Sequence, residues 1–314
     1  MRTNKEIKAN GWLFVDKPIG ISSNRVLQKI KRLFLNVKVG YVGTLDPMAT
    51  GFLPIAVGKA TKTIKYIEKV NKEYIFTLEW GVQTETGDVE GKKIRYKNIY
   101  PDENEINDKI SEFKGNLSQK PSKYSAIKVN GERAYKIARK GGEFEIPARN
   151  IEVYDMKLIK RINKVRSLFY VNCSSGTYVR TLAEDLAKSL GTYGHLLSLR
   201  RVGFGKLDKK LISLDSLISL MHIDKLIELL KPIDDIFYGV KKMNLDEKEA
   251  RILMDGKFIV ATESVRKKLS IAKVNNLVIA KYKKELLVIG NINGKNFHPE
   301  TTMNINFNTA CIRS

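Results

Sequence analysis

The sequence has few residues of the kinds that bind metals or form redox pairs. Among its 314 residues only two are cysteines, Cys173 and Cys311, and they form no Cys-x-x-Cys pair, which argues against zinc sites and thiol redox motifs. The three histidines, His195, His222 and His298, are too far apart for a local metal motif, although a fold can join distant residues. We therefore expect no metal site.

The sequence also has no motif for a nucleotide-hydrolysing site and no membrane segment. The stretch 58–61 reads Gly-Lys-Ala-Thr, whereas a phosphate-binding loop needs Ser or Thr directly after Gly-Lys. No apolar run approaches the roughly 18 residues of a membrane helix, and the first residues lack the apolar core of a signal peptide. The sequence predicts a cytoplasmic, reduced and soluble protein that has no cofactor and does not bind a membrane.

Acidic residues are scarce relative to basic ones. The chain has 56 Lys and Arg against 34 Asp and Glu, a net charge of +22. The part from residue 241 onward carries +7, which leaves +15 on the first 240 residues. A surface this basic attracts polyanions, and charge spread along the chain favours a broad RNA footprint over a membrane-tethering patch. The alternative is a general compositional bias towards Lys, Ile and Asn.

Apolar periodicity predicts both helices and strands. Period-two alternation is clearest over 72–80, where Tyr74, Phe76, Leu78 and Trp80 share one face. Glycines and Pro47 interrupt 40–51, 81–91 reads as an acidic loop, and 121–149 reads as a basic excursion from the core. Further strands are expected at 11–15, 167–173, 195–202, 276–282 and 286–291, and helices at about 26–34, 101–117, 179–190 and 211–230.

An acid stands in an otherwise small and apolar loop, Gly43-Thr-Leu-Asp46-Pro47-Met-Ala-Thr-Gly51. Pro47 restricts the backbone of Asp46 to extended geometry, and the flanking glycines let a ligand or another backbone approach closely. A carboxylate held in this way suits nucleophilic or base chemistry. From the residues alone, however, a turn is the more common meaning of Asp before Pro.

The part of the chain from about residue 10 to 205 resembles the TruB-type pseudouridine synthases. The family signature matches Val39 to Gly51, and three other blocks occur in the right order between about residues 10 and 205. They are Gly11 to Pro18 with Ser22-Ser-Asn, Lys72-Glu-Tyr74, and Gly176-Thr-Tyr-Val-Arg-Thr181, followed by Leu199-Arg-Arg. Each block is short, but the ordered set is specific.

The resemblance implies an α+β fold with two domains. Residues 1–240 are expected to form the pseudouridine synthase domain, a mixed and largely antiparallel central sheet with flanking helices. Residues 241–314 are expected to form a small β-rich domain of the PUA type, which binds RNA. This second match is looser than the first.

The resemblance also assigns the chemistry to three residues. Asp46 matches the essential aspartate, which attacks the sugar C1′ or the ring, or acts through a glycal. Tyr74 matches the aromatic residue that stacks on the uracil, and Arg180 matches the arginine that pairs with the aspartate and keeps it ionised. On residue type alone, Tyr74 could belong to the core and Arg180 to the surface.

Four further residues are expected to bind or support the substrate. Tyr178 and Leu199 match residues that line the pocket, and Lys17 belongs to a block that supports the catalytic loop. Tyr41 departs from the family, because many members have His there to fill the gap left by the flipped base. Tyrosine is also flat and can form hydrogen bonds, so it could stack in the same gap.

The excursion 121–149 resembles the insert that reaches over RNA in the bacterial-type enzymes. Its cations suit contacts with phosphates. The residues expected to make these contacts are Lys123, Lys128, Arg133, Lys136, Arg139 and Lys140. The insert favours a stand-alone enzyme, without an obligatory protein partner, that acts on uridine 55 in the T-loop of tRNA. We expect this enzyme to be a monomer.

Two other functions are compatible with parts of the sequence. A guide-dependent relative that modifies ribosomal RNA would share the catalytic block, but the insert argues against it. An RNA-binding or tRNA-folding protein without essential catalysis would explain the charge and the C-terminal domain equally well. Such a protein has no need of Asp46, Tyr74 and Arg180 together, and this distinguishes it from an enzyme.

Overall fold

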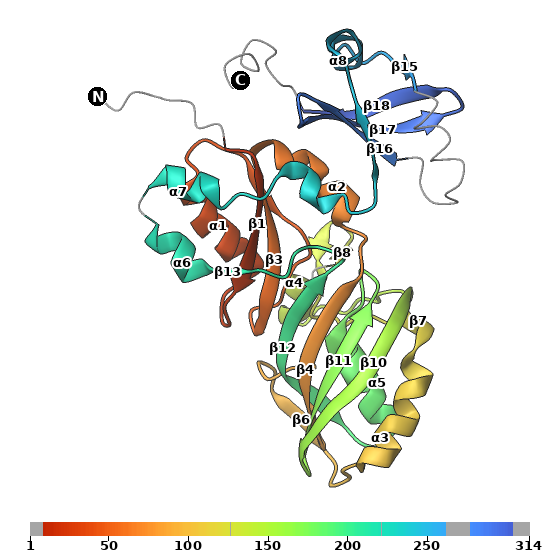
Figure 1. The fold of residues 1–314 in the computed structure, drawn as a ribbon. Coiled ribbons are helices and arrows are strands. Elements are labelled where there is room, and N and C mark those ends of the chain that lie inside the picture. Colours follow the sequence, from red (N-terminus) through yellow and green to blue (C-terminus); the bar gives the residue numbers. More distant parts are fainter. Residues whose placement is uncertain (1–8, 126, 221, 262–276, 304–314) are drawn as a thin grey trace.

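A nine-stranded mixed sheet forms the centre of the larger part of the molecule (Figure 1). The computed structural model describes residues 9–125, 127–220, 222–261 and 277–303. The strands run in the order β13-β1-β3-β12-β4-β11-β10-β7, with β2 paired to β3. They are β1 (Gly11–Lys17), β2 (Val39–Tyr41), β3 (Ala49–Val57), β4 (Lys72–Trp80), β7 (Gly115–Gln119), β10 (Arg149–Asn163), β11 (Arg166–Cys173), β12 (Gly194–Phe204) and β13 (Ile212–Ser213).

Most neighbouring strands of this sheet are antiparallel, as the expected fold requires. Only the β1–β13 and β3–β12 pairs are parallel. Two small hairpins stand beside the sheet and complete the strands of this part. They are β5 (Val82–Thr84) with β6 (Lys93–Tyr96), and β8 (Lys128–Val129) with β9 (Glu132–Arg133).

Helices cover the sheet in two groups (Figure 1). One group contacts the β10–β11 end and another contacts the β1–β13 end. The first contains α3 (Glu103–Ile110) and α5 (Val179–Ser189), and the second contains α1 (Ser23–Leu33), α6 (Leu214–Ser219) and α7 (Ile223–Glu228). Shorter elements are α2 (Ile64–Ile67), α4 (Ala134–Arg139) and the 3₁₀ turns Gly58–Thr63, Ser111–Phe113 and Ile233–Ile236.

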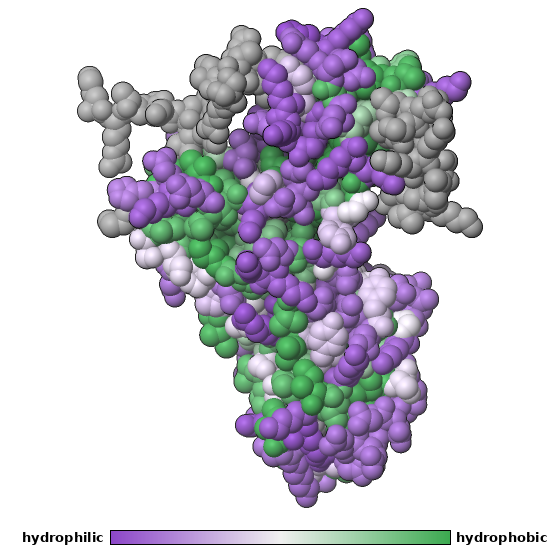
Figure 2. All heavy atoms as spheres, in the orientation of Figure 1, coloured by the Kyte–Doolittle hydropathy of each residue, from purple (hydrophilic) through white to green (hydrophobic). Residues whose placement is uncertain are grey.

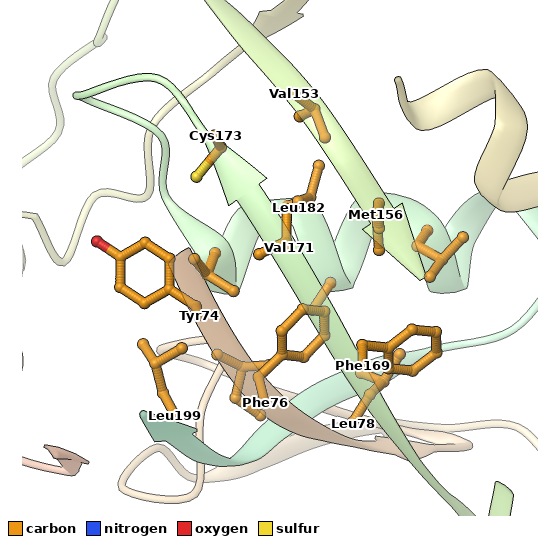
Figure 3. Close-up of a cluster of buried hydrophobic side chains, with 14 of the residues drawn as sticks. Tyr74, Phe76, Leu78, Val153, Met156, Phe169, Val171, Cys173, Leu182 and Leu199 are labelled. Carbon is orange, nitrogen blue, oxygen red and sulfur yellow. The ribbon is translucent and has the colours of Figure 1, made fainter. Parts of the chain in front are cut away.

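Strand β4 explains how the sequence positions the core. Its residues alternate between buried and half-buried along the whole strand, which matches the predicted range and period. The buried side chains pack with Phe169 on β11, and the Phe76 and Phe169 rings stack with centroids 5.2 Å apart. Figure 3 shows Tyr74 at one end of this cluster, with its hydroxyl pointing away from Phe76. Tyr74 therefore lies on the buried face of β4, at the point where the core meets the edge of a cavity.

A five-stranded sheet forms the C-terminal part of the described chain (Figure 1). Its order is β14-β16-β17-β18-β15, and helix α8 (Glu247–Met254) packs on it. This agrees with the expected β-rich domain of the PUA type. The strands are β14 (Lys241–Asn244), β15 (Ile259–Val260), β16 (Leu277–Tyr282), β17 (Glu285–Asn293) and β18 (Asn296–Thr302).

The C-terminal sheet contacts the segment around α2 through β18. Lys65 Nζ lies 2.7 Å from Glu300 Oε1, and the hydroxyls of Tyr66 and Thr301 are 2.9 Å apart. Ile279 and Ile289 belong to the same apolar cluster as Trp12 and Phe52 of the central sheet. Figure 2 shows hydrophilic side chains over both the C-terminal sheet and the opposite end of the molecule.

Two long strands are absent from the sequence-based expectations. Strand β3 is almost entirely buried, so it shows no alternation, and its glycine and proline read as interruptions. Strand β10 pairs with β11 through three register shifts, which break its alternation in three places. Both strands are therefore hidden from a search for period-two patterns.

Three expected segments differ from the structure in extent. The helix predicted over 101–117 ends at Ile110, and Gly115, with a φ of +87°, turns the chain into β7. The helix predicted over 211–230 is two short helices, because Leu220 and His222 are extended. The predicted loop 81–91 contains strand β5. Position 276, the first residue of a predicted strand, lies outside the described residues.

Candidate active site

The loop that carries Asp46 lies between β2 and β3 and is held from behind. The hydroxyl of Ser23 accepts a hydrogen bond from the Leu45 N–H at 2.8 Å and donates one to the Leu45 carbonyl at 3.0 Å. Leu45 and Met48 are buried in the core on either side of Asp46 and Pro47. The Ala49 N–H donates to the Asp46 carbonyl at 3.1 Å, so the loop does contain a turn, and this turn presents the carboxylate.

Lys17 supports the same loop. Its buried ammonium donates to the carbonyls of Pro18 at 2.8 Å, Ile21 at 2.6 Å and Pro47 at 3.2 Å. Three carbonyl oxygens match the three donors of an ammonium group. Lys17 lies behind the loop and does not line the cavity. This position fits the support of the loop that the resemblance implies better than direct contact with a substrate.

An ion-pair network joins Asp46 to the start of helix α5. Arg180 Nε lies 3.1 Å from Asp46 Oδ2, and Arg180 Nη1 lies 3.3 Å from Asp88 Oδ2. The Arg180 and Asp88 side chains are only 6% and 4% exposed, whereas that of Asp46 is 39% exposed. The carboxylate of Asp46 is thus the accessible member of a buried charge network.

Arg180 also donates to two backbone carbonyls. Nη1 donates to the Thr86 carbonyl at 2.8 Å and Nη2 donates to the Tyr124 carbonyl at 3.2 Å. Tyr124 belongs to the 121–149 excursion, so a single guanidinium contacts Asp46, the loop after β5 and the base of that excursion. A planar guanidinium with its donors occupied in this way has one favoured orientation.

A cavity of about 800 Å³ opens at this network. Tyr74 and Leu199 lie at its wall, from β4 and β12, and both side chains are buried. Tyr178 is fixed by its backbone, since its N–H donates to Gln119 Oε1 at 2.8 Å and Gln119 Nε2 donates to its carbonyl at 3.1 Å. Tyr41 is half-buried at the cavity wall on β2.

The charges around the cavity influence one another. Burial lowers the pKa of Lys17 to about 8, although the negative charges of Asp46 and Glu90 oppose this. Partial burial raises the pKa of Glu90, and the nearby Asp88 and Asp46 raise it further. Burial also raises the pKa of the Tyr74 hydroxyl. The cavity therefore combines acids, cations and a neutral phenol within a small volume.

The six expected phosphate-binding cations lie outside the cavity. All six are exposed, on the β8–β9 hairpin, on α4 and on the segments next to them. Lys140 pairs with Glu132 at 3.1 Å, and the Arg139 guanidinium lies 5.9 Å from the centre of the Tyr135 ring. Ser125 and Ile127, from the same excursion, line the cavity. The excursion thus contributes to the cavity wall as well as to the basic surface.

Sequence reasoning missed two buried residues of the site. Asp88 was included only in an acidic loop, and its position between Gly87 and Gly91 in a tight turn was the available signal. Its Oδ1 accepts bonds from Thr86 Oγ1 at 2.6 Å and from the Glu90 N–H at 3.0 Å. Arg201 lines the cavity from β12, and no local pattern distinguishes it from Arg200.

The described residues offer no group of three or more His, Cys, Asp or Glu that could hold a metal ion. None of the described helices has the length and apolar character that a membrane crossing requires.

Comparison with known proteins identifies the family. Residues 31–179 match the family model for the N-terminal domain of TruB family pseudouridylate synthases, and residues 180–237 match that for the C-terminal domain of tRNA pseudouridylate synthase B. The chain belongs to the TruB family of pseudouridylate synthases. The cavity is lined from both matched regions, with Asp46 in the first and Arg180 in the second.

Relatives agree over most of the chain. The tRNA pseudouridine synthase B of Caulobacter vibrioides is 38% identical over 260 residues, which cover 82% of this chain and 84% of the relative. That of Ehrlichia ruminantium is 42% identical over 245 residues, which cover 74% and 82%. A solved H/ACA RNP bound to a substrate RNA containing 2′-deoxyuridine contains a chain of the same fold. It has a TM-score of 0.69 and 22% identity, and the match covers 94% of this chain and 85% of that one.

Proposed function

We propose that this TruB-family protein isomerises uridine to pseudouridine at position 55 in the T-loop of tRNA, with Asp46 as the catalytic carboxylate. The observation that carries the proposal is the Asp46 carboxylate, held 3.1 Å from the buried Arg180 guanidinium and still exposed to a cavity of about 800 Å³. The names of the relatives from Caulobacter and Ehrlichia support tRNA as the substrate.

The reaction moves one bond of the nucleotide. The C1′–N1 bond breaks, the uracil turns, and a C1′–C5 bond forms while C5 loses its proton and N1 gains one. No electrons are exchanged with another molecule, so no redox partner is needed. Asp46 takes part by attack at C1′, by attack at the ring or by a glycal route. In each case the base must first leave the RNA stack, because an enzyme cannot reach C1′ and C5 within it.

Other residues of the cavity have supporting roles in this proposal. Tyr74 stacks on the flipped uracil, Arg180 orients Asp46, and Tyr178 and Leu199 complete the wall. Tyr41 contacts the RNA beside the extracted base, and Lys17 holds the catalytic loop. The buried network costs no reorganisation during the reaction, because its partners are already in place.

In this proposal the excursion 121–149 binds the T-stem-loop. Its cations are exposed on one short segment, and Tyr124, at its base, accepts a hydrogen bond from Arg180. We infer that the protein acts as a monomer in the cytoplasm without an obligatory protein partner. Residues 241–314 form an RNA-binding domain, and residues 1–240 form the catalytic domain with the insert. The cations that contact phosphates are Lys123, Lys128, Arg133, Lys136, Arg139 and Lys140.

The proposal is tested with an unmodified tRNA transcript. The purified protein is incubated with the transcript, and pseudouridine is mapped at single-nucleotide resolution. We expect product at position 55 with the wild type and none with Asp46→Asn. Product at another tRNA position would correct the site, and product from Asp46→Asn would exclude Asp46 as the catalytic group. An RNA-binding protein without catalysis would bind the transcript and give no product with either.

A further inference from the structure

A second arginine, Arg201, holds the catalytic loop in place. Its side chain is fully buried below the cavity. Its Nε donates to the Phe52 carbonyl at 2.7 Å, and its Nη2 donates to the Gly43 carbonyl at 2.7 Å. Gly43 lies at the start of the loop that carries Asp46, and Phe52 lies in β3, the strand that follows the loop. One guanidinium therefore joins the start of this loop to the strand that follows it.

The two glycines that flank Asp46 both pack against Arg201. A Cβ added at Gly43 would lie 3.1 Å from Arg201 Nη1 and 2.9 Å from Phe204 Cε2. A Cβ at Gly51 would overlap the Arg201 carbonyl, because β3 and β12 pair there in parallel register. Both glycines also have positive φ values, +69° and +98°. Gly51 therefore lets the backbone of β12 approach closely, and Gly43 leaves room for the Phe204 ring and the Arg201 guanidinium.

The charge of Arg201 has no acidic counterpart in the described part of the chain. No carboxylate there lies within ion-pair distance of it, and its Nη1 is a buried donor without a hydrogen-bond partner among the described residues. Arg201 and Tyr74 are directly opposite each other where β12 pairs with β4, and both line the cavity. The positive charge of Arg201 opposes the rise that burial causes in the pKa of the Tyr74 phenol. The guanidinium also lies 5.2 Å from the centre of the Phe204 ring.

A buried and unpaired cation is costly, and a well-packed apolar residue of similar volume is often at least as stable. Stability alone is therefore a weak reason to place an arginine here. The geometry supplies another reason, because Arg201 contacts the start of the Asp46 loop and the strand that follows it, and it also pairs with Tyr74 across β12 and β4. These are the parts of the site whose relative placement decides whether a flipped base meets the carboxylate.

We propose that Arg201 is a positioning residue for the isomerisation, which fixes the Asp46 loop and holds the Tyr74 ring against the cavity. This role rests on the proposed function of the cavity. Arg201 need not touch the substrate to fulfil it. A shift of about 1 Å in a reacting group can cost about a hundredfold in rate, so a loosened loop would slow the reaction strongly.

The neighbouring Arg200 is a matched control on the same strand. Its exposed guanidinium pairs with Asp16 at 2.7 Å and lies 3.5 Å from the Thr50 hydroxyl. The experiment compares Arg201→Met and Arg201→Lys with Arg200→Met. It measures the rate of pseudouridine formation in a single turnover at saturating protein, the affinity for the tRNA transcript and the melting temperature.

We expect Arg201→Met to slow the single-turnover rate by about tenfold to a hundredfold, with affinity for tRNA within about threefold of the wild type. Arg201→Lys keeps the charge but loses the fork that reaches both carbonyls, so it should be slowed as well. Arg200→Met should stay within about threefold in rate, since exposed pairs contribute little.

A double-mutant cycle with Tyr74→Phe separates positioning from a general loss of stability. If Arg201 acts partly through Tyr74, the rate loss of Arg201→Lys with Tyr74→Phe is smaller than the product of the single losses. Independent, multiplying losses would overturn the link to Tyr74. A folded Arg201→Lys protein with the wild-type rate would overturn the proposal. This test holds even if Arg201→Met fails to fold. Wild-type protein without product on any tRNA would instead overturn the proposed function.

Discussion

Two basic regions of this molecule use their charges in different ways. In the cavity, the Arg180 guanidinium is buried, and carboxylates and carbonyls occupy its donors within 3.3 Å. In the excursion 121–149, six cations are exposed to solvent. A buried charge is fixed by its partners and can orient a reacting group, whereas an exposed charge remains available to an outside polyanion. We therefore expect the buried charges to serve the reaction and the exposed charges to bind the RNA.

The largest expected effect comes from removing the centre of the buried network. Arg180→Met leaves Asp88 buried without its partner, which should lower the free energy of unfolding by about 3–5 kcal/mol. Chemical denaturation measures this loss. Arg200→Met is the control, because that side chain pairs with Asp16 at the surface, where the two side chains are 45% and 33% exposed, and it should cost less than about 1 kcal/mol. Similar losses in both variants would contradict the distinction between the two kinds of charge.

Asp88→Asn tests whether the network orients Asp46. The substitution keeps the shape of the side chain but removes the charge that holds Arg180 from the far side. We expect the single-turnover rate to fall about tenfold to a hundredfold, since small misplacements of a reacting group are costly. Affinity for tRNA should stay within about threefold. Asp185→Asn, on the exposed side of α5, is the control, and an equal rate for both variants would show that Asp88 has no part in the chemistry.

Neutralising the cations of the excursion should lower the affinity for tRNA and leave the reaction rate nearly unchanged. A variant with its six expected phosphate-binding cations replaced by Gln should bind tRNA more weakly. Its affinity should also depend less on salt, by about 0.7–0.9 in the logarithmic slope for each phosphate that the variant no longer neutralises. Titration of labelled tRNA at several salt concentrations measures the slope. A slope equal to that of the wild type would attribute the net charge to general composition.

The smallest effect concerns Glu90. Its pKa is raised in the folded protein, so the ionised carboxylate destabilises the fold at pH values above this raised pKa. Below the ordinary value of 4.5 the carboxyl is protonated in both states, and the destabilisation disappears. Glu90→Gln should therefore stabilise the protein at pH 7, and the gain should disappear as the pH falls below 4.5. Solvent screening of this exposed side chain keeps the gain below about 0.5 kcal/mol. Melting temperatures of the wild type and Glu90→Gln at pH 7 and below pH 4.5 measure this gain. A gain in stability that is larger at the lower pH would contradict the prediction.

Local patterns were enough to predict some elements of the fold. Strand β4 was predicted over its full length because its alternation and its burial coincide. Helix α5 was predicted over its full length and one residue beyond, and Gly191, which follows it, adopts a φ of +71°. Strands β3 and β10 were missed, because complete burial in one and register shifts in the other remove the period on which such predictions depend.

The candidate site and its support Lys17 were predicted from the ordered motifs, whereas the supporting residues Asp88 and Arg201 were not. Asp46, Tyr74 and Arg180 come from separate blocks, and the fold brings all three to one cavity. Their roles stay predictions. Arg201 lies 158 positions from Gly43 and contacts it only after β12 pairs beside β3. A contact made by the sheet leaves no local trace in the sequence.

We infer that the cavity performs the chemistry while the excursion holds the RNA. One experiment tests it directly, by comparing Asp46→Asn with the six-cation variant in single turnover at saturating protein. We predict normal tRNA affinity without pseudouridine for Asp46→Asn, and weak affinity with a nearly wild-type rate for the six-cation variant. Product from Asp46→Asn, or a slow rate at saturation for the six-cation variant, would contradict the account.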